Sequence, residues 1–158
     1  MNWASGLLWG FVATIALTTL SAGAQGLGLT RMSFPDVLGQ AVTPGRDRAK
    51  VYGLLIHGAL GLVYALIYAA IFESLHSARW WIGAVLGLAH AIFVLTVVMT
   101  VLPSVHPRMA SDHYGPTAKR ALEPPGFLAL HYGVQTPLAI IVSHVVFGVI
   151  LGAFYHLS

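Results

Sequence analysis

Long apolar stretches alternate with short polar ones along this chain. No Asp, Glu, Lys or Arg occurs in residues 1–30, 51–72, 80–107 or 126–158. A helix needs about 20 apolar residues to cross the hydrocarbon core of a bilayer. The pattern predicts four membrane spans near residues 6–26, 51–72, 80–102 and 137–157, joined by loops 31–50 and 103–136. We therefore expect an all-α, polytopic four-helix bundle that forms a single transmembrane domain over residues 1–158.

Composition agrees with a membrane protein. Only 8% of the residues are charged and 57% are hydrophobic, whereas about a quarter of the residues of a soluble domain are charged. The net charge of +3 is small and comes from the loops, so nucleic acid is not an expected partner. The stretch SAGAQ at residues 21–25 resembles a signal-peptidase site, but no basic residue precedes Trp9. We therefore expect the first span to be retained as a helix.

The basic residues predict the orientation in the membrane. One of them, Arg79, lies between the second and third spans, while the two longer loops carry Arg31, Arg46, Arg48, Lys50, Arg108, Lys119 and Arg120. Cytoplasmic loops of membrane proteins carry an excess of Lys and Arg. We expect loops 31–50 and 103–136 in the cytoplasm and both termini on the opposite side.

Small residues recur at every fourth position in each span. They are Gly6, Gly10, Thr14, Thr18, Ala22 and Gly26 in the first, Gly53, Gly61, Ala65 and Ala69 in the second, Gly83, Gly87 and Ala91 in the third, and Gly148 and Gly152 in the fourth. Residues four apart share one helix face, and small residues let helix axes approach closely in lipid. The pattern predicts a tightly packed bundle; the alternative is that the glycines leave room for a flat cofactor.

The second and fourth spans share one pattern of residue types. It reads His-x3-Gly-x3-small-x2-Tyr and comprises His57, Gly61, Ala65 and Tyr68 in the second span, and His144, Gly148, Gly152 and Tyr155 in the fourth. The helical rise places the two imidazoles within about 2 Å of the same depth. This similarity indicates two helical hairpins related by a pseudo-twofold axis along the membrane normal.

Three functions are open for the histidines within the spans, because ionisable groups there usually mark functional sites. His57 and His144 could donate hydrogen bonds to Thr14, Thr18, Ser143 or a carbonyl and fix the register of the helices. They could instead be the two axial ligands of haem b, with Gly61 and Gly148 making room for the porphyrin. With His90 they could relay protons or bind a metal ion. In the long loop, His106 and His113 are further weak candidates for a metal site.

No nucleophile or acid–base set accompanies these histidines, so we expect no catalytic activity of the chain's own. The chain lacks Cys, and no Ser-His-Asp arrangement, phosphate loop or zinc-protease motif is present. We expect an accessory or structural subunit that packs in the lipid bilayer against a membrane-protein partner or a second copy. The alternatives are a bis-histidine haem protein for electron transfer and a proton or metal pathway through an oligomer.

Three stretches resemble a family of small, uncharacterised bacterial integral membrane proteins with four spans. They are GFVATIALTTL in the first span, MSFPDVLGQ just after it and SHVVFGVILGAFY in the last. The resemblance implies a bacterial origin and a multi-pass protein of the cytoplasmic membrane, and it carries no assigned activity. It also implies that FPDVLG at residues 34–39 caps the bundle at the cytoplasmic face.

Overall fold

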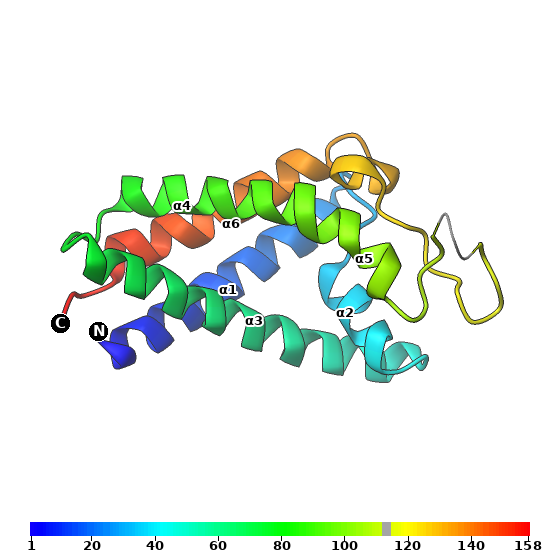
Figure 1. Ribbon diagram of the computed structural model, residues 1–158, viewed down its shortest axis with the longest axis horizontal. Coiled ribbons are helices and arrows are strands. Elements are labelled where there is room, and N and C mark those ends of the chain that lie inside the picture. The colour runs from blue at the N-terminus through cyan, green and yellow to red at the C-terminus, as the bar shows by residue number, and fades with distance from the viewer. Residues whose placement is uncertain (112–114) are drawn as a thin grey trace.

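Four helices run along the length of the molecule, as Figure 1 shows for a computed structural model that describes residues 1–111 and 115–158. They are α1 (Trp3–Gly26), α3 (Arg46–Ser74), the continuous helix Trp80–Val105 and α6 (Thr136–Phe154). The third consists of α4 (Trp80–Phe93), a π-helical segment η1 (Val94–Val98) and α5 (Met99–Val105). All four are long and apolar enough to span a membrane, so the predicted all-α four-helix bundle is confirmed.

Helix α3 is longer than the span predicted from hydropathy. It begins at Arg46 rather than residue 51, because its first turns project beyond the apolar segment and pack against α2 (Phe34–Val42). The N-cap of α2 is Ser33, whose hydroxyl accepts a hydrogen bond from the amide of Asp36 at 3.3 Å. Gly39 of α2 contacts the carbonyl of Ala49, and Gly53 of α3 contacts that of Pro35. The predicted loop 31–50 therefore contains a docked helix.

Glycines also bring two pairs of long helices into close contact. In the α4–α6 pair a Cβ on Gly83 would overlap the carbonyl of Gly148, and a Cβ on Gly87 would overlap that of His144. In the α1–α3 pair a Cβ on Gly10 would overlap Ala65. The small-residue faces thus pack as predicted for most of their length. Gly26, at the end of the first stripe, has open space around it.

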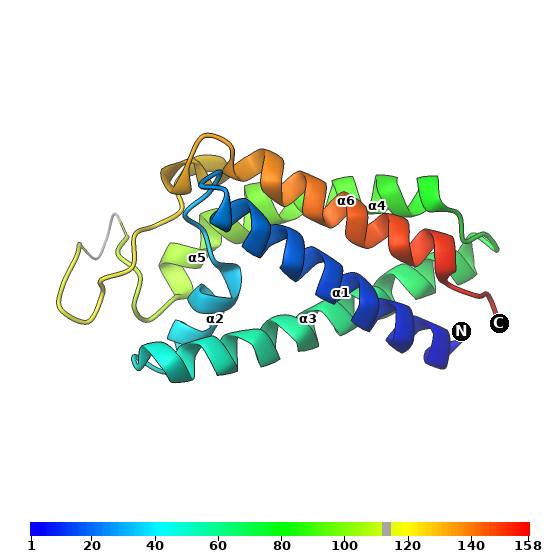
Figure 2. The same cartoon turned by 180° about the vertical axis from the view of Figure 1, so that it is seen from behind.

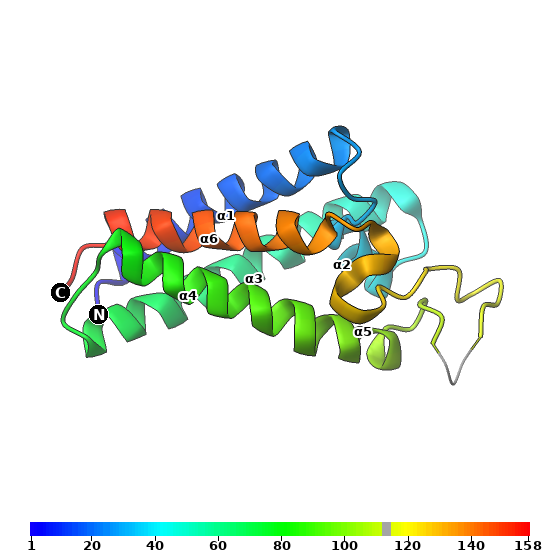
Figure 3. The same cartoon turned by 90° about the horizontal axis from the view of Figure 1, so that it is seen from above.

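The two hairpins of the predicted repeat are α1–α3 and α4–α6, and they meet asymmetrically. Helix α1 also packs against α6, as Figures 2 and 3 show, whereas α3 and α4 do not pack along their length in the described residues. They are close at the short turn between them and diverge towards the other end of the molecule (Figure 1). The bundle is therefore closed on one side and hollow on the other.

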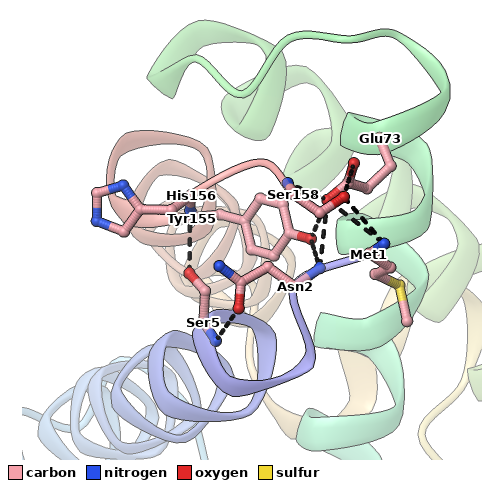
Figure 4. A network of polar contacts seen from close by, with 7 residues as sticks. All are labelled: Met1, Asn2, Ser5, Glu73, Tyr155, His156 and Ser158. Carbon is pink, nitrogen blue, oxygen red and sulfur yellow. Dashed lines mark hydrogen bonds and ion pairs between the residues drawn. The ribbon is translucent and has the colours of Figure 1, made fainter.

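Both chain ends lie beside the α3–α4 turn, where Glu73 connects them (Figure 4). The Glu73 carboxylate accepts hydrogen bonds from the Tyr155 hydroxyl at 2.7 Å and from the amide of Ser158 at 2.9 Å. It also accepts a bond from the amide of Asn2 at 3.3 Å. Tyr155, the counterpart of Tyr68 in the sequence repeat, thus bonds to the chain ends through its hydroxyl, and both tyrosines are buried in the same hydrophobic core.

The basic residues gather at the opposite end of the molecule. There α2, the end of α5 and the 3₁₀ segment η2 (Phe127–Tyr132) lie together, and the described residues between α5 and η2, 106–111 and 115–126, project outward (Figure 1). Arg31 forms an ion pair with Glu123 at 3.1 Å. The charge asymmetry read from the sequence is therefore an asymmetry between the two ends of the bundle.

Replacing Gly148 with Ala will destabilise the protein, because the added methyl group overlaps the backbone of α4. Overpacking of this kind costs about 1–3 kcal/mol. The matched control is Gly23→Ala in α1, where the methyl group enters open space and removes a flexible helix glycine. Thermal unfolding in detergent measures both variants. Equal midpoints for Gly148→Ala and Gly23→Ala would contradict the close backbone contact.

Candidate functional site

A cavity of about 290 Å³ lies between the four long helices in the hollow half of the bundle. Its walls come from α1, α3, the α4–α5 helix and α6, and α2 contributes Phe34, Pro35 and Leu38. Just over half of the remaining lining residues are aliphatic or aromatic: Leu17, Met32, Leu60, Tyr64, Val94, Val98, Met99, Leu102, Ala139, Ile140 and Phe147. Among the described residues, no Asp, Glu, Lys or Arg lines it. It is a predominantly apolar site of the size at which ligand pockets begin.

All three histidines of the spans line this one cavity. His57 comes from α3, His90 from α4 and His144 from α6. The rings of His90 and His144 meet edge to face, with centroids 4.7 Å apart. The structure thus brings the predicted pair His57 and His144 to a common cavity, while the direct ring contact is between His90 and His144.

Two tyrosines of α3 hold His90 in place. The ring of Tyr64 stacks on the imidazole with centroids 3.9 Å apart. The hydroxyl of Tyr68 lies 3.4 Å from His90 Nδ1. Because α3 and α4 diverge, these long aromatic side chains bridge a space that small residues could not. Sequence analysis assigned no role to Tyr64, although its spacing of three residues from Gly61 places it on the same face.

His144 is oriented by its own helix. Its Nδ1 donates a hydrogen bond to the carbonyl oxygen of Ile140 at 2.8 Å. Of the hydrogen-bonding functions considered for the histidines, donation to a carbonyl is therefore the one observed at His144. Since a carbonyl only accepts, the proton of the neutral ring is on Nδ1 and Nε2 carries a lone pair.

His57 differs from the other two, because its Nε2 is buried and has no hydrogen-bond partner among the described residues. Its ring meets Phe34 of α2 edge to face, with centroids 5.9 Å apart. The Thr14 and Thr18 hydroxyls, expected as partners, donate instead to the carbonyls of Gly10 and Thr14 at 2.7 Å. An unpartnered buried polar atom is uncommon in native structures and calls for an occupant or a function.

The π-helical segment η1 keeps one face of its helix on the cavity. His90, Val94, Val98 and Leu102 all line the cavity although they are four residues apart. A step of four overshoots a regular 3.6-residue turn, so such a row would drift round an α-helix. The wider π turn reduces that drift. Single π turns recur at functional sites, and no sequence signal identified this one beforehand.

The two glycines next to the paired histidines face different surroundings. Gly61 lines the cavity and also contacts Thr14 of α1. Gly148 contacts the backbone of Gly83 instead, so α4 fills the face that a porphyrin beside His144 would need. Gly61 is thus placed to border a ligand, whereas Gly148 is a packing residue. Haem ligation by His57 and His144 remains a prediction that Gly148 does not support.

Of the weak metal candidates, His90 lines the cavity and His106 does not. His106 lies at the end of α5, outside the cavity: its Nε2 donates to the carbonyl of Val37 at 2.9 Å and its Nδ1 accepts from the amide of Arg108 at 3.2 Å. Both ring nitrogens are thus occupied, and no lone pair is free for a metal. His113 is outside the described residues. Among residues 1–111 and 115–158, no three His, Asp or Glu side chains are grouped to hold a metal ion.

His106 and Arg108 instead fasten α2 across the basic end of the bundle. The Arg108 guanidinium donates to the carbonyl of Gln40, next to the His106 bond to Val37. Both acceptors lie in α2, which also lines the cavity through Leu38. The pair therefore positions one wall of the site without touching it.

The cavity has the parts of a binding site: an apolar wall, three imidazoles and no charged side chain. It provides no nucleophile that is hydrogen-bonded to a base in the described residues. No protein family model, curated protein or solved structure matches this chain.

Acidification below about pH 6.5 will destabilise the protein partly through His106. Burial lowers the pKa of His106 from its usual 6.5, against the opposing effect of the Val37 hydrogen bond. Below 6.5 the unfolded chain binds a proton that the folded chain does not, so stability falls as the pH falls. His106→Gln keeps an amide donor and does not titrate. Its unfolding midpoint will therefore fall less than that of the wild type between about pH 7.5 and about pH 5.5. An identical fall in both proteins would contradict this.

Proposed function

We propose that this multi-pass membrane protein binds a neutral, mainly apolar small molecule in the histidine cavity. The observation that carries the proposal is the grouping of His57, His90 and His144 around one apolar space, with the buried Nε2 of His57 unpartnered. Polar groups inside a membrane bundle are expensive and are kept where they serve a function. A helix bundle needed only for packing has no use for a hollow lined with imidazoles.

The lining supports a neutral ligand. A charged group in this cavity would have no opposite charge beside it, because Asp, Glu, Lys and Arg are absent from the walls. An unpaired charge taken out of water is strongly unfavourable. A neutral molecule with a polar group at one place can use the imidazoles and leave the rest of its surface to the apolar wall.

The outer surface of the bundle supports arrival of the ligand from the bilayer. Large apolar side chains cover the long helices on the outside, for example Leu55 at 65% exposure on α3 and Val85 at 61% on α4. Such a surface is suited to lipid rather than water. The cavity lies on the side where α3 and the α4–α5 helix diverge, so this side offers a route from the acyl chains.

The other roles expected from the sequence stay predictions, and the structure gives each of them less support. An accessory subunit or homo-oligomer would need small residues on its outer surface for close contact with a partner helix. The small-residue positions Gly10, Gly61, Gly83 and Gly148 instead make contacts within the chain. A proton or metal pathway would need polar groups continuing from the cavity towards both surfaces. Towards the turn of α3 and α4, His90 is followed by Tyr68 and then by the fully buried Phe72.

We also propose that the protein resides in a bacterial cytoplasmic membrane with its basic end inside. The proposal rests on the basic residues, which gather at the end holding α2 and η2, whereas Arg79 is at the other. Both termini would then face away from the cytoplasm.

Protein purified from bacterial membranes into lipid nanodiscs will retain a neutral small molecule detectable by native mass spectrometry. Ala139→Phe places a ring in the cavity and will abolish the retention. The control Ala89→Phe adds the same ring on the exposed face of α4 and will not. Retention that is equal in the two variants, or absent from the wild type, refutes the proposal. A Soret band lost in His57→Ala and in His144→Ala would establish the haem alternative instead.

Single cysteines will report the orientation, because the chain has none of its own. Ser74→Cys lies at the end with the termini and Ala121→Cys at the basic end, and both positions are exposed. A membrane-impermeant maleimide will label Ser74→Cys in intact bacteria and Ala121→Cys only after permeabilisation. The reverse pattern would show that the basic end faces outward.

A further inference from the structure

We infer that the ligand of the cavity is a hydrogen-bond donor, of the class of hydroxyl-bearing apolar molecules, and that its hydroxyl donates to His144 Nε2. This inference rests on the proposed function and names the chemistry of its ligand. It comes from the hydrogen-bond roles of the polar groups in the wall.

The side-chain hydroxyls of the wall have already used their protons. Thr14 donates to Gly10, Thr18 to Thr14 and Ser21 to Leu17, each at 2.7–2.9 Å to the carbonyl oxygen one turn earlier. Ser143 donates to the carbonyl of Ile140 at 3.0 Å. A hydroxyl has one proton, so these groups are left with lone pairs only. They can accept a hydrogen bond from a ligand but cannot donate one.

Two more hydroxyls of the wall are engaged with each other. Thr30 and Thr136 lie with their oxygens 2.7 Å apart, and the Thr30 oxygen also accepts from the amide of Met32 at 3.0 Å. One of the two protons is used between them. This pair lies at the α2 end of the cavity, away from His144, because Thr136 is eight residues before it on α6.

His144 adds a stronger acceptor at the other end. Its proton is committed to the Ile140 carbonyl through Nδ1, so Nε2 of the neutral ring can only accept. A ligand whose polar group is a ketone, ester or ether would place its lone pairs against this lone pair. A hydroxyl meets the nitrogen with a proton and keeps its own oxygen as an acceptor.

The shape of the cavity places the rest of the ligand. His90 and His144 lie at one end, whereas the ring of His57 meets Phe34 of α2. From His144 to Thr136 along α6 the helical rise gives about 12 Å. Along the α4–α5 helix, the same rise separates His90 from Leu102 by about 18 Å. The wall between is formed by residues such as Val94, Met99 and Ile140. The ligand therefore has its hydroxyl at one end and an elongated apolar body that extends towards α2.

Two probes that differ only in a hydroxyl proton test whether the ligand donates a hydrogen bond. We choose para-octylphenol and its methyl ether para-octylanisole, because the ether has the same shape and cannot donate. Binding to the protein in phosphatidylcholine nanodiscs is measured against empty nanodiscs, which corrects for partition into lipid. The phenol will bind about tenfold more tightly than the ether, the size expected for loss of a partner to a buried acceptor.

The protein variants assign the acceptor. His144→Phe keeps a ring of similar size and removes Nε2, so phenol and ether will bind it equally. His156→Phe makes the same change at an exposed histidine at the other end of α6 and will keep the preference. Because the comparison of the two probes on the wild type needs no variant, the donor inference is tested even if His144→Phe fails to fold.

Each outcome has one meaning. Equal binding of phenol and ether to the wild type overturns the donor inference and leaves the proposed function standing. A preference that survives in folded His144→Phe overturns the assignment to His144. Binding of neither probe above the level of empty nanodiscs, together with no retained molecule in the native mass spectrum, overturns the proposed function itself.

Discussion

Direct contact between helix backbones at glycine positions determines where this bundle is closed and where it is hollow. Lipid gives no hydrophobic drive for helices to associate, so close packing of backbones has to supply it. Gly83 and Gly148 provide that contact between α4 and α6, and between α1 and α3 Gly10 lies against the small side chain of Ala65. Since α3 uses its small-residue face for α1, it has none left for α4. Tyr64 and Tyr68 bridge the remaining space, and the cavity lies beside them.

Most polar groups of the cavity wall form hydrogen bonds within the protein. Threonine and serine hydroxyls bond back to their own helices, which makes them tolerable in an apolar environment. His144 does likewise through Nδ1 and His90 uses Tyr68, which leaves His57 Nε2 as the buried atom without a partner in the described residues. His90 and His144 are thus held in orientation, while Nε2 of His57 and Nε2 of His144 remain for a ligand. Fixed polar groups in a dry site recognise a ligand at little cost in reorganisation.

Periodicity was sufficient to predict much of the fold from the sequence. Runs without charge located all four spans, and small residues at every fourth position identified the faces that meet at Gly83 and Gly148. Both patterns are local, because each concerns one helix and its own axis. Helix α2 was missed as an element because its nine residues are too short for a span and include Pro35 and Gly39, which favour loops.

The sequence predicted that two of the histidines share a site, but it did not predict which rings touch. The repeat in the second and fourth spans paired His57 with His144, and both line one cavity. Their common depth in the membrane stays a prediction, because α3 begins at Arg46 and α6 at Thr136, so the two rings are not equally far from the helix starts. Which rings touch depends on how each helix is turned about its axis relative to the others. That rotation is set by contacts between chain segments far apart in sequence, such as Gly87 against His144. The ring contact of His90 with His144 and the π turn after His90 therefore could not be read from spacing alone.

The two ends of the bundle bear on how a ligand reaches the cavity. At one end Glu73 ties the α3–α4 turn to Tyr155 and Asn2, and core side chains such as Phe72 fill the interior. At the other, α2 lies across the opening and is fastened by the Val37 bond to His106 and the Gln40 bond to Arg108. Entry from water at either end would have to break these contacts. On the side where α3 and α5 face each other, both helices line the cavity through apolar side chains such as Leu60 and Leu102. A binding site that is closed by hydrogen bonds at both ends, and whose lateral face is apolar, is suited to a molecule that is already dissolved in the bilayer.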